Sequence, residues 1–144
     1  MAHKQSEKQT GETDYLFVYG TLRSDSYSDS HRQFIAPHFE LVGRATIAGR
    51  LYAIVDYPGL LPAEEATDLV IGEVYAFTGG EEQLLEVDDY EGCAPHSPKP
   101  HLYTRTRINA HLKGDEIIEA WVYFYNYPVS DTMLIRSGDF MDPF

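Results

Sequence analysis

The sequence predicts an α+β fold in which a closed or nearly closed β-sheet dominates and one or two short helices accompany it. Three observations support this prediction. Short runs rich in apolar, β-branched and aromatic residues recur along the chain, and turn-favouring residues separate them. Only one longer segment carries a clear helix signal, and eleven tyrosines are many for a chain of 144 residues. With 43% hydrophobic residues, a chain of this length can bury a core without a disulfide or a structural metal.

The first predicted strand comprises residues 15–19, a short apolar run that Gly20 interrupts. Further strands are expected at residues 39–42, 45–52, 70–77, 103–112 and 117–125. Turn signals occur at residues 56–59 and 113–115, and the second of them predicts a hairpin between the last two strands.

One helix is predicted over residues 81–90, where good helix formers follow Thr78 and Glu81, which have the spacing of a capping box. Gly92 stands where a left-handed helix end is expected. Residues 31–36 are predicted to form a second, short helix after a Ser/Asp-rich loop at residues 24–30.

The N-terminal residues differ in composition from the rest of the chain. Residues 1–13 are polar and are predicted to be a disordered tail, whereas residues 14–144 are expected to form a single domain. No stretch approaches the ~20 apolar residues of a membrane span, and the start of the chain lacks the apolar segment of a signal peptide.

The composition excludes several classes of partner. A formal net charge of −12 argues against nucleic acid and against an anionic membrane, because both require clustered Lys and Arg. Cys93 is the only cysteine, which excludes an internal disulfide and fits a reducing, cytoplasmic location. We interpret Cys93 as a small apolar residue beside a turn rather than as a nucleophile, since no Cys-His arrangement surrounds it.

The first candidate site is Tyr19-Gly20-Thr21-Leu22-Arg23, directly after the first strand. A Gly at the end of a strand lets successive backbone N–H groups turn toward one point and bind an anion or an oxyanion. The segment is not a phosphate-binding loop, because the second Gly and the Lys-Ser/Thr ending are missing. An ordinary turn is the alternative interpretation.

The second candidate site is the acidic end of the predicted helix, where Asp88 and Asp89 precede Glu91. Glu91 is expected just past the helix C-terminus, where the negative end of the helix dipole disfavours further negative charge. The two neighbouring carboxylates act in the same direction, and burial would add to the effect. The pKa of Glu91 is therefore expected to lie above its ordinary value of about 4.3, as a proton-exchanging carboxyl requires. A solvated helix end is the alternative.

Other residue clusters indicate little chemistry. His96 and His101 lie in a Pro-rich loop without the spacing of metal ligands, so no metal site is predicted. The alternating residues 121–127 are interpreted as a core strand rather than as a stacking platform.

Taken in order, these segments resemble the γ-glutamylcyclotransferase-like family, in particular its branch of AIG2-like proteins and γ-glutamylamine cyclotransferases. The resemblance covers roughly residues 14–126. It rests on the segments Tyr19-Gly20-Thr21-Leu22-Arg23, Ala45-Thr46-Ile47-Ala48-Gly49-Arg50-Leu51-Tyr52, Tyr57-Pro58-Gly59, Gly72-Glu73-Val74-Tyr75, Asp88-Asp89-Tyr90-Glu91-Gly92, Tyr103-Thr104-Arg105 and Ala120-Trp121-Val122-Tyr123.

The resemblance implies a small mixed β-barrel and a cyclotransferase activity that releases 5-oxoproline from a γ-glutamyl amine or γ-glutamyl peptide. In that reaction the α-amine of the γ-glutamyl group attacks its own side-chain carbonyl. Carried over by motif, Glu91 would be the general acid/base, and the loop Tyr19, Gly20, Thr21 and Leu22 would hold the γ-glutamyl head. No metal or organic cofactor is required.

Three further side chains are weaker candidates. Tyr103 and Tyr125 are candidates for the wall of the substrate pocket, with core packing as the alternative. Arg23 is either a group that attracts a substrate carboxylate or an exposed surface arginine.

A small-molecule γ-glutamyl substrate is the expected partner, and the protein is expected to be a monomer or a weak homodimer. Two other functions stay open at this point. The chain is alternatively a non-catalytic binding or interaction module that retains the γ-glutamyl pocket, or an enzyme acting on a γ-glutamyl-tagged carrier.

Overall fold

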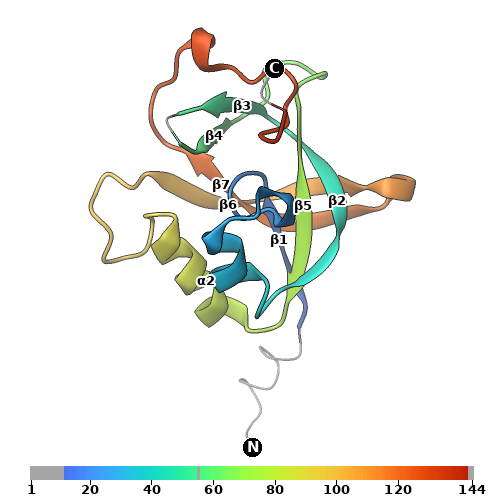
Figure 1. The fold of residues 1–144 in the computed structure, drawn as a ribbon, viewed down its shortest axis with the longest axis vertical. Helices are drawn as coiled ribbons and strands as arrows, with labels where there is room; N and C mark the ends of the chain where they lie inside the picture. Colours follow the sequence, from blue (N-terminus) through green and yellow to red (C-terminus); the bar gives the residue numbers. More distant parts are fainter. Residues whose placement is uncertain (1–11, 55, 143–144) are drawn as a thin grey trace, which may run out of the picture.

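The computed structural model describes residues 12–54 and 56–142, and in these residues five strands close into a barrel (Figure 1). The barrel order is β1 (Asp14–Val18), β5 (Leu69–Phe77), β2 (Glu40–Ala48), β6 (Tyr103–Leu112) and β7 (Ile117–Tyr125). All neighbouring pairs are antiparallel except β1 and β7, which close the barrel as a parallel pair. The predicted mixed barrel is confirmed. The tail predicted at residues 1–13 lies outside the described residues, apart from its last two positions.

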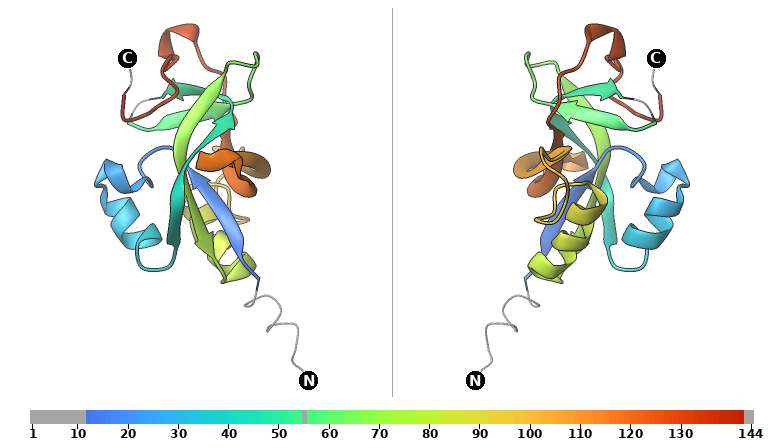
Figure 2. Two further views of the ribbon diagram at one scale, coloured as in Figure 1. Left: turned by 90° about the vertical axis from the view of Figure 1, so that its right-hand side faces the viewer. Right: turned by 90° about the vertical axis from the view of Figure 1, so that its left-hand side faces the viewer.

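The remaining elements lie at the two ends of the barrel. Strands β3 (Arg50–Ala53) and β4 (Pro58–Leu61) form a separate two-stranded sheet. Figures 1 and 2 place this sheet, with the segment after β7, at one end, and α2 (Gly80–Tyr90) toward the other. Short helical turns occur at Ser24–Ser26, His31–Ile35, Lys113–Asp115 and Asp131–Met133. In the described part of the chain, no helix is long and apolar enough to cross a membrane.

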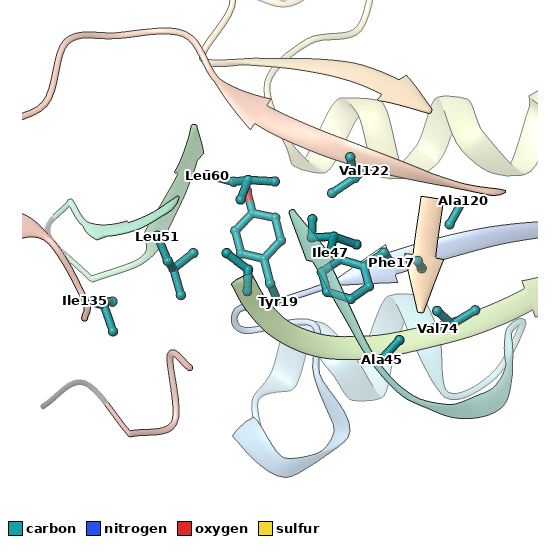
Figure 3. Packing of buried hydrophobic residues seen from close by; sticks show 12 residues of the cluster. Phe17, Tyr19, Ala45, Ile47, Leu51, Leu60, Val74, Ala120, Val122 and Ile135 are labelled. Atoms are coloured by element: carbon teal, nitrogen blue, oxygen red, sulfur yellow. The ribbon is translucent and has the colours of Figure 1, made fainter. Parts of the chain in front are cut away.

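From Tyr15 to Val18, strand β1 is apolar on both of its faces because both faces are covered. Phe17 belongs to the cluster inside the barrel, whereas Leu16 and Val18 belong to a second cluster that includes Leu84 and Val87 of α2. A strand buried on two sides loses the usual alternation of apolar and polar residues, which explains the continuous run in the sequence. Figure 3 shows the inner cluster extending from Ala45 and Val74 within the barrel to Leu51 and Ile135 near β3.

Several predicted boundaries are wrong, and each error has a local cause. The strands expected at residues 39–42 and 45–52 are divided differently: β2 runs continuously along β5 with a bulge between Leu41 and Gly43, and the chain turns later, at Gly49. A Cβ at Gly49 would lie 2.7 Å from the Leu60 side chain, so the close approach of β4 requires glycine there.

Only the first half of the turn predicted at residues 56–59 lies outside a strand, because Pro58 and Gly59 begin β4 and pair with β3. Pro58 occupies the first position of the strand, where a missing N–H is tolerated. The hairpin turn predicted at residues 113–115 is confirmed, since a helical turn joins β6 to β7 there. The left-handed helix end predicted at Gly92 is also confirmed, since its φ is 75°.

The two predicted helices are also present, although the first is capped differently. The capping box predicted for Thr78 and Glu81 is not formed, because it requires Thr78 as the N-cap, whereas Gly79 is the N-cap and the helix begins at Gly80. The side-chain oxygen of Gln83 instead accepts the backbone N–H of Gly79 at 2.9 Å. The short helix predicted at 31–36 corresponds to His31–Ile35.

Gly72 offers a test of the packing between β1 and β5. A Cβ at this position would lie 2.2 Å from the Val18 carbonyl oxygen and 2.6 Å from the Phe17 ring, so Gly72→Ala forces backbone and ring apart. We expect a loss of at least ~1–3 kcal/mol in the free energy of unfolding, measured by denaturant titration. Gly43→Ala is the matched control, because its Cβ would meet only the Leu112 side chain at 3.8 Å. Equal stability of the two variants would contradict the described packing.

Candidate active site

A cavity of about 280 Å³ opens between the end of β1, the end of α2 and the outer face of β6 and β7. Its size lies at the lower end of the range for ligand pockets, which suits a small molecule. Aromatic and aliphatic side chains form most of its wall. The lining residues are Phe17, Val18, Tyr19, Gly20, Thr21, Leu22, Tyr57, Pro58, Tyr90, Glu91, Leu102, Tyr103 and Tyr123.

The loop after β1 forms one side of the cavity, and its backbone is held close to the β3–β4 sheet. A Cβ at Gly20 would lie 2.7 Å from Pro58, so only glycine fits at this contact. The backbone N–H of Arg23 donates to the Gly20 carbonyl at 3.0 Å, which closes a turn. Within the described residues, no acceptor pairs with the backbone N–H of Thr21 or Leu22. Two backbone donors are therefore available beside the cavity for a ligand oxygen.

The Ser/Asp-rich segment after this loop fixes Thr21 in place. The hydroxyl of Ser26 donates to the Thr21 carbonyl at 2.7 Å, and the Ser28 hydroxyl donates to the same oxygen. The hydroxyl of Tyr90 lies 3.1 Å from that of Thr21 and donates to the Ser30 hydroxyl at 2.9 Å. The composition of residues 24–30 thus has a structural use, which is to order the rim of the cavity.

Arg23 is a buried structural residue, and both interpretations offered from the sequence are wrong. Its exposed fraction is 0%. The guanidinium group makes two hydrogen bonds to Asp25, at 2.9 and 2.6 Å, and one to Asp139 at 2.7 Å. Burial alone would lower the pKa of Arg23, but these two carboxylates outweigh it and raise the pKa. Arg23 consequently ties the loop after β1 to the segment after β7.

Glu91 occupies the C-cap of α2, and its side chain lines the cavity. Its backbone N–H still donates to the Val87 carbonyl at 2.9 Å, so the helix geometry sets its position. Burial of the carboxyl group, and then the charge of Asp88, raise the pKa of Glu91 from 4.5 to about 8. No side chain among the described residues hydrogen-bonds this carboxyl group, so nothing there stabilises its ionised form. Glu91 can therefore exchange a proton near neutral pH.

Asp88 lies one helical turn before Glu91 and anchors the end of α2 to the barrel. Its carboxylate accepts hydrogen bonds from Arg105 of β6 at 2.8 and 3.0 Å and from the Tyr123 hydroxyl of β7 at 2.6 Å. The partners come from two adjacent strands, so the helix end is fixed in two directions. The carboxylate also maintains a negative charge beside Glu91.

Two buried tyrosines complete the wall through hydroxyl groups that are already satisfied. The hydroxyl of Tyr19 donates to the Tyr123 carbonyl at 2.6 Å, and that of Tyr103 donates to the Pro58 carbonyl at 2.8 Å. Burial raises the pKa of both groups, so both stay neutral donors. Their rings therefore give the cavity a rigid, apolar surface.

Of the residues predicted for the site, six line the cavity: Tyr19, Gly20, Thr21, Leu22, Glu91 and Tyr103. Tyr125 does not line it; its ring packs edge-on against the ring of Tyr103, with centroids 5.5 Å apart. The sequence interpretation missed Tyr57, Tyr90 and Tyr123. Two signals were available, since Tyr90 precedes Glu91 directly and Tyr123 shares a strand face with Tyr125.

Cys93 and the neighbouring histidines do not form a second reactive centre. Burial, with the nearby carboxylates of Asp88 and Glu91, raises the pKa of the Cys93 thiol to about 12, which disfavours the nucleophilic thiolate. His96 contacts Asp89 at 2.6 Å on the exposed side of the helix end. Across residues 12–54 and 56–142, no cluster of His, Cys, Asp or Glu is arranged to hold a metal ion.

The whole arrangement matches a described family. The family model for γ-glutamyl cyclotransferases, AIG2-like, aligns with residues 16–142, which include the end of β1, the loop after it and the C-terminal segment that holds Arg23. The chain belongs to this γ-glutamyl cyclotransferase family.

Individual relatives agree with this assignment. The chain is 30% identical to a candidate γ-glutamylcyclotransferase of Methanocaldococcus jannaschii over 129 residues, which cover 90% of this chain and 97% of that protein. It is 32% identical over 128 residues to YtfP of Escherichia coli, a γ-glutamylcyclotransferase family protein, with 88% and 96% covered. Among solved structures, a mouse AIG2-like protein superposes with a TM-score of 0.64 at 24% identity, covering 85% and 82% of the two chains. At that identity the structural likeness supports the shared fold.

The raised pKa of Glu91 makes the stability of the protein depend on pH. Between about pH 4.5 and 8 the folded protein keeps a proton on Glu91 that the unfolded chain releases. Stability contributed by this group therefore falls as pH rises through that window, by up to ~1.4 kcal/mol per pH unit. Glu91→Gln removes the effect, so the variant should gain in Tm over the parent protein progressively from pH 5 to pH 8.

Thermal melts at several pH values measure this difference. Glu86→Gln replaces an exposed carboxylate on the same helix and is the matched control, for which the difference should stay constant. A constant difference for Glu91→Gln as well would contradict the burial of its carboxyl group.

Proposed function

We propose that this protein cyclises a γ-glutamyl amine or a γ-glutamyl peptide, releasing the amine and 5-oxoproline. The observation that carries the proposal is the carboxyl group of Glu91, which has a pKa of about 8 and shares a small cavity with unpaired backbone donors. In the reaction, a bond forms between the α-nitrogen and the γ-carbonyl carbon of the substrate. The bond from that carbon to the leaving nitrogen breaks. The α-nitrogen, an ammonium group at neutral pH, loses two protons to become the ring N–H, and the leaving nitrogen gains two protons and departs as an ammonium group.

Glu91 takes a proton from the α-nitrogen and returns it to the leaving nitrogen. An α-ammonium group has no free electron pair, so a base must take its proton before it can attack the carbonyl. A carboxylate of ordinary pKa is too weak a base for this step, whereas one with a pKa of about 8 is close in basicity to an amine. The protonated Glu91 then donates this proton to the departing nitrogen. The second proton of the former α-ammonium group leaves the ring nitrogen as the intermediate collapses, and the released amine takes up a proton from solvent.

The loop after β1 stabilises the tetrahedral intermediate. Attack on the carbonyl places a negative charge on its oxygen, and donors fixed in advance at that point lower the barrier. The backbone N–H groups of Thr21 and Leu22 suit this role, because both residues line the cavity and neither N–H has an acceptor among residues 12–54 and 56–142. Their geometry is held by the hydroxyl groups of Ser26 and Ser28.

The cavity wall holds the substrate in the conformation that the reaction requires. The substrate must fold so that its α-nitrogen reaches its own γ-carbonyl, and the buried rings of Tyr19 and Tyr103 with Leu22 leave little room for extended conformers. Holding reacting groups in this way contributes several kcal/mol to such reactions, up to about 7–11 kcal/mol. No electron transfer and no external nucleophile take part, so the substrate, these side chains and the protons exchanged with solvent account for every atom of the step.

Replacement of Glu91 tests the mechanism directly. Glu91→Gln keeps the shape of the side chain but can neither take nor return a proton, so we expect kcat to fall by about 10²–10⁴-fold. The measurement is release of 5-oxoproline from a panel of γ-glutamyl compounds, with Glu86→Gln as the control that retains activity. Turnover by Glu91→Gln at the parent rate would refute the mechanism. Thermal stabilisation by these compounds without product would instead favour a non-catalytic binding module.

The pH dependence of the same reaction provides an independent test. Since kcat/KM reports groups of the free enzyme, it should rise about tenfold per pH unit below about pH 7 and level off above pH 8, as Glu91 loses its proton. Initial rates at low substrate concentration between pH 5 and 9 measure this profile. An acidic limb centred near pH 4.5 would show that the base is a carboxyl group of ordinary pKa.

A further inference from the structure

The cavity has a buried floor and a partly exposed rim, and these differ in what they can bind. Tyr19, Leu22 and Tyr123 of the floor are buried. At the rim, Tyr90 is 38% exposed and Tyr57 is half-buried. If the γ-glutamyl head occupies the floor, as the proposed function requires, the leaving amine extends past the rim toward solvent. The rim residues therefore select the leaving group.

The rim offers no partner for a carboxylate. Among the described residues that line the cavity, the one charged type is the acidic Glu91, and no Lys, Arg or His is present. Arginine is the residue that proteins most often use to bind carboxylates, through paired hydrogen bonds. A leaving amino acid or peptide would bring a second carboxylate, in addition to the α-carboxylate of the γ-glutamyl head, to a rim without a cation on a protein of net charge −12.

The arginines that flank the site are already committed to internal partners. Arg23 is buried against Asp25 and Asp139. Arg105, on the other side of the Asp88 carboxylate, is paired with Asp88 and with Glu81 at 3.0 Å. Recruiting Arg105 for a ligand would leave the buried Asp88 carboxylate unpaired, and recruiting Arg23 would take the cation from the partly buried carboxylates of Asp25 and Asp139. Both changes are costly.

The rim does offer aromatic surface from two separate elements. Tyr57 lies in the connection between β3 and β4. Its ring is the first in a series of neighbouring tyrosine rings that includes residues of β6, β7 and the segment after β7. Successive ring centroids in the series Tyr57, Tyr103, Tyr125 and Tyr127 are 6.4, 5.5 and 5.8 Å apart. Tyr90 comes from the end of α2, and its ring contacts Phe34 with centroids 5.1 Å apart. These separations lie within the 4.5–7 Å range of favourable aromatic contacts, so a planar ligand group can extend the same packing.

We infer that the preferred substrates are γ-glutamyl amides of arylalkylamines, whose leaving amine bears a planar apolar group and no carboxylate, and that γ-glutamyl peptides are disfavoured. The inference rests on the proposed function. It names Tyr57 and Tyr90 as the residues that contact the leaving group. Tyr125, which is not among the lining residues, supports the ring of Tyr103 by packing against it.

Two matched pairs of compounds test the inference through kcat/KM for release of 5-oxoproline. γ-Glutamyl-phenethylamide and γ-glutamyl-phenylalanine differ by one carboxylate, and we expect the amide to react at least about tenfold better, by ~1.4 kcal/mol of discrimination. γ-Glutamyl-phenethylamide and γ-glutamyl-butylamide differ by the ring, and the aromatic compound should again be preferred. Equal or better turnover of γ-glutamyl-phenylalanine would overturn the inference while leaving the cyclotransferase function intact.

Variants of the rim residues test whether the rim determines the preference for the leaving group. Tyr57→Leu should reduce the ratio of kcat/KM for the phenethylamide over the butylamide, and Tyr27→Leu, at a residue 82% exposed outside the cavity wall, should leave this ratio unchanged. Leu102→Arg adds a cation to the rim and should raise turnover of γ-glutamyl-phenylalanine relative to the phenethylamide. An unchanged ratio in both Tyr57→Leu and Leu102→Arg would contradict selection at the rim. Absence of product from every compound would refute the proposed function itself, and the inference with it.

Discussion

The site depends on the contact between the Asp88 carboxylate and the barrel. Arg105 and the Tyr123 hydroxyl hold this carboxylate from two adjacent strands, and α2 is thereby fixed so that its C-cap faces the cavity. Loss of one partner from such a buried pair typically costs about 3–5 kcal/mol, so the helix end has little freedom to move. The same charge, one turn before Glu91, also disfavours ionisation of the catalytic candidate. This contact thus positions the proposed base, and its charge adds to the rise in pKa that burial of Glu91 mainly causes.

A second constraint acts on the loop after β1. Leaving the N–H groups of Thr21 and Leu22 without acceptors is unfavourable unless neighbouring groups prevent the loop from rearranging to satisfy them. Arg23 provides that restraint through Asp25 and Asp139, and the serine hydroxyls provide it through the Thr21 carbonyl. The polar residues around the loop therefore preserve a geometry that the loop would not keep by itself.

The sequence was most informative where local pattern decides the structure. The bounds of β6 and β7 agree with prediction because each is a long run ending at a clear turn, and Glu91 lies past the helix end because Gly92 stops the helix. Arg23 could not be placed, since its partner Asp139 is 116 positions away and nothing local indicates burial. Tyr57 is part of the wall through the β3–β4 sheet, whose second strand starts with a Pro-Gly pair that signals a turn. Long-range packing, not residue preference, decided these cases.

The way the barrel closes has a consequence for the newly made chain. Strand β1 pairs with β7, and the loop after β1 is held by Asp139. Both β7 and Asp139 therefore emerge from the ribosome long after β1 and its loop. A nascent chain that already contains Glu91 and the glycine loop still lacks the wall of the cavity. Pairing between such distant segments is slow compared with local structure formation, because the loop between them must first be closed. Until then the edge of β1 that pairs with β7 stays open, and this interval is when the chain most needs protection from aggregation.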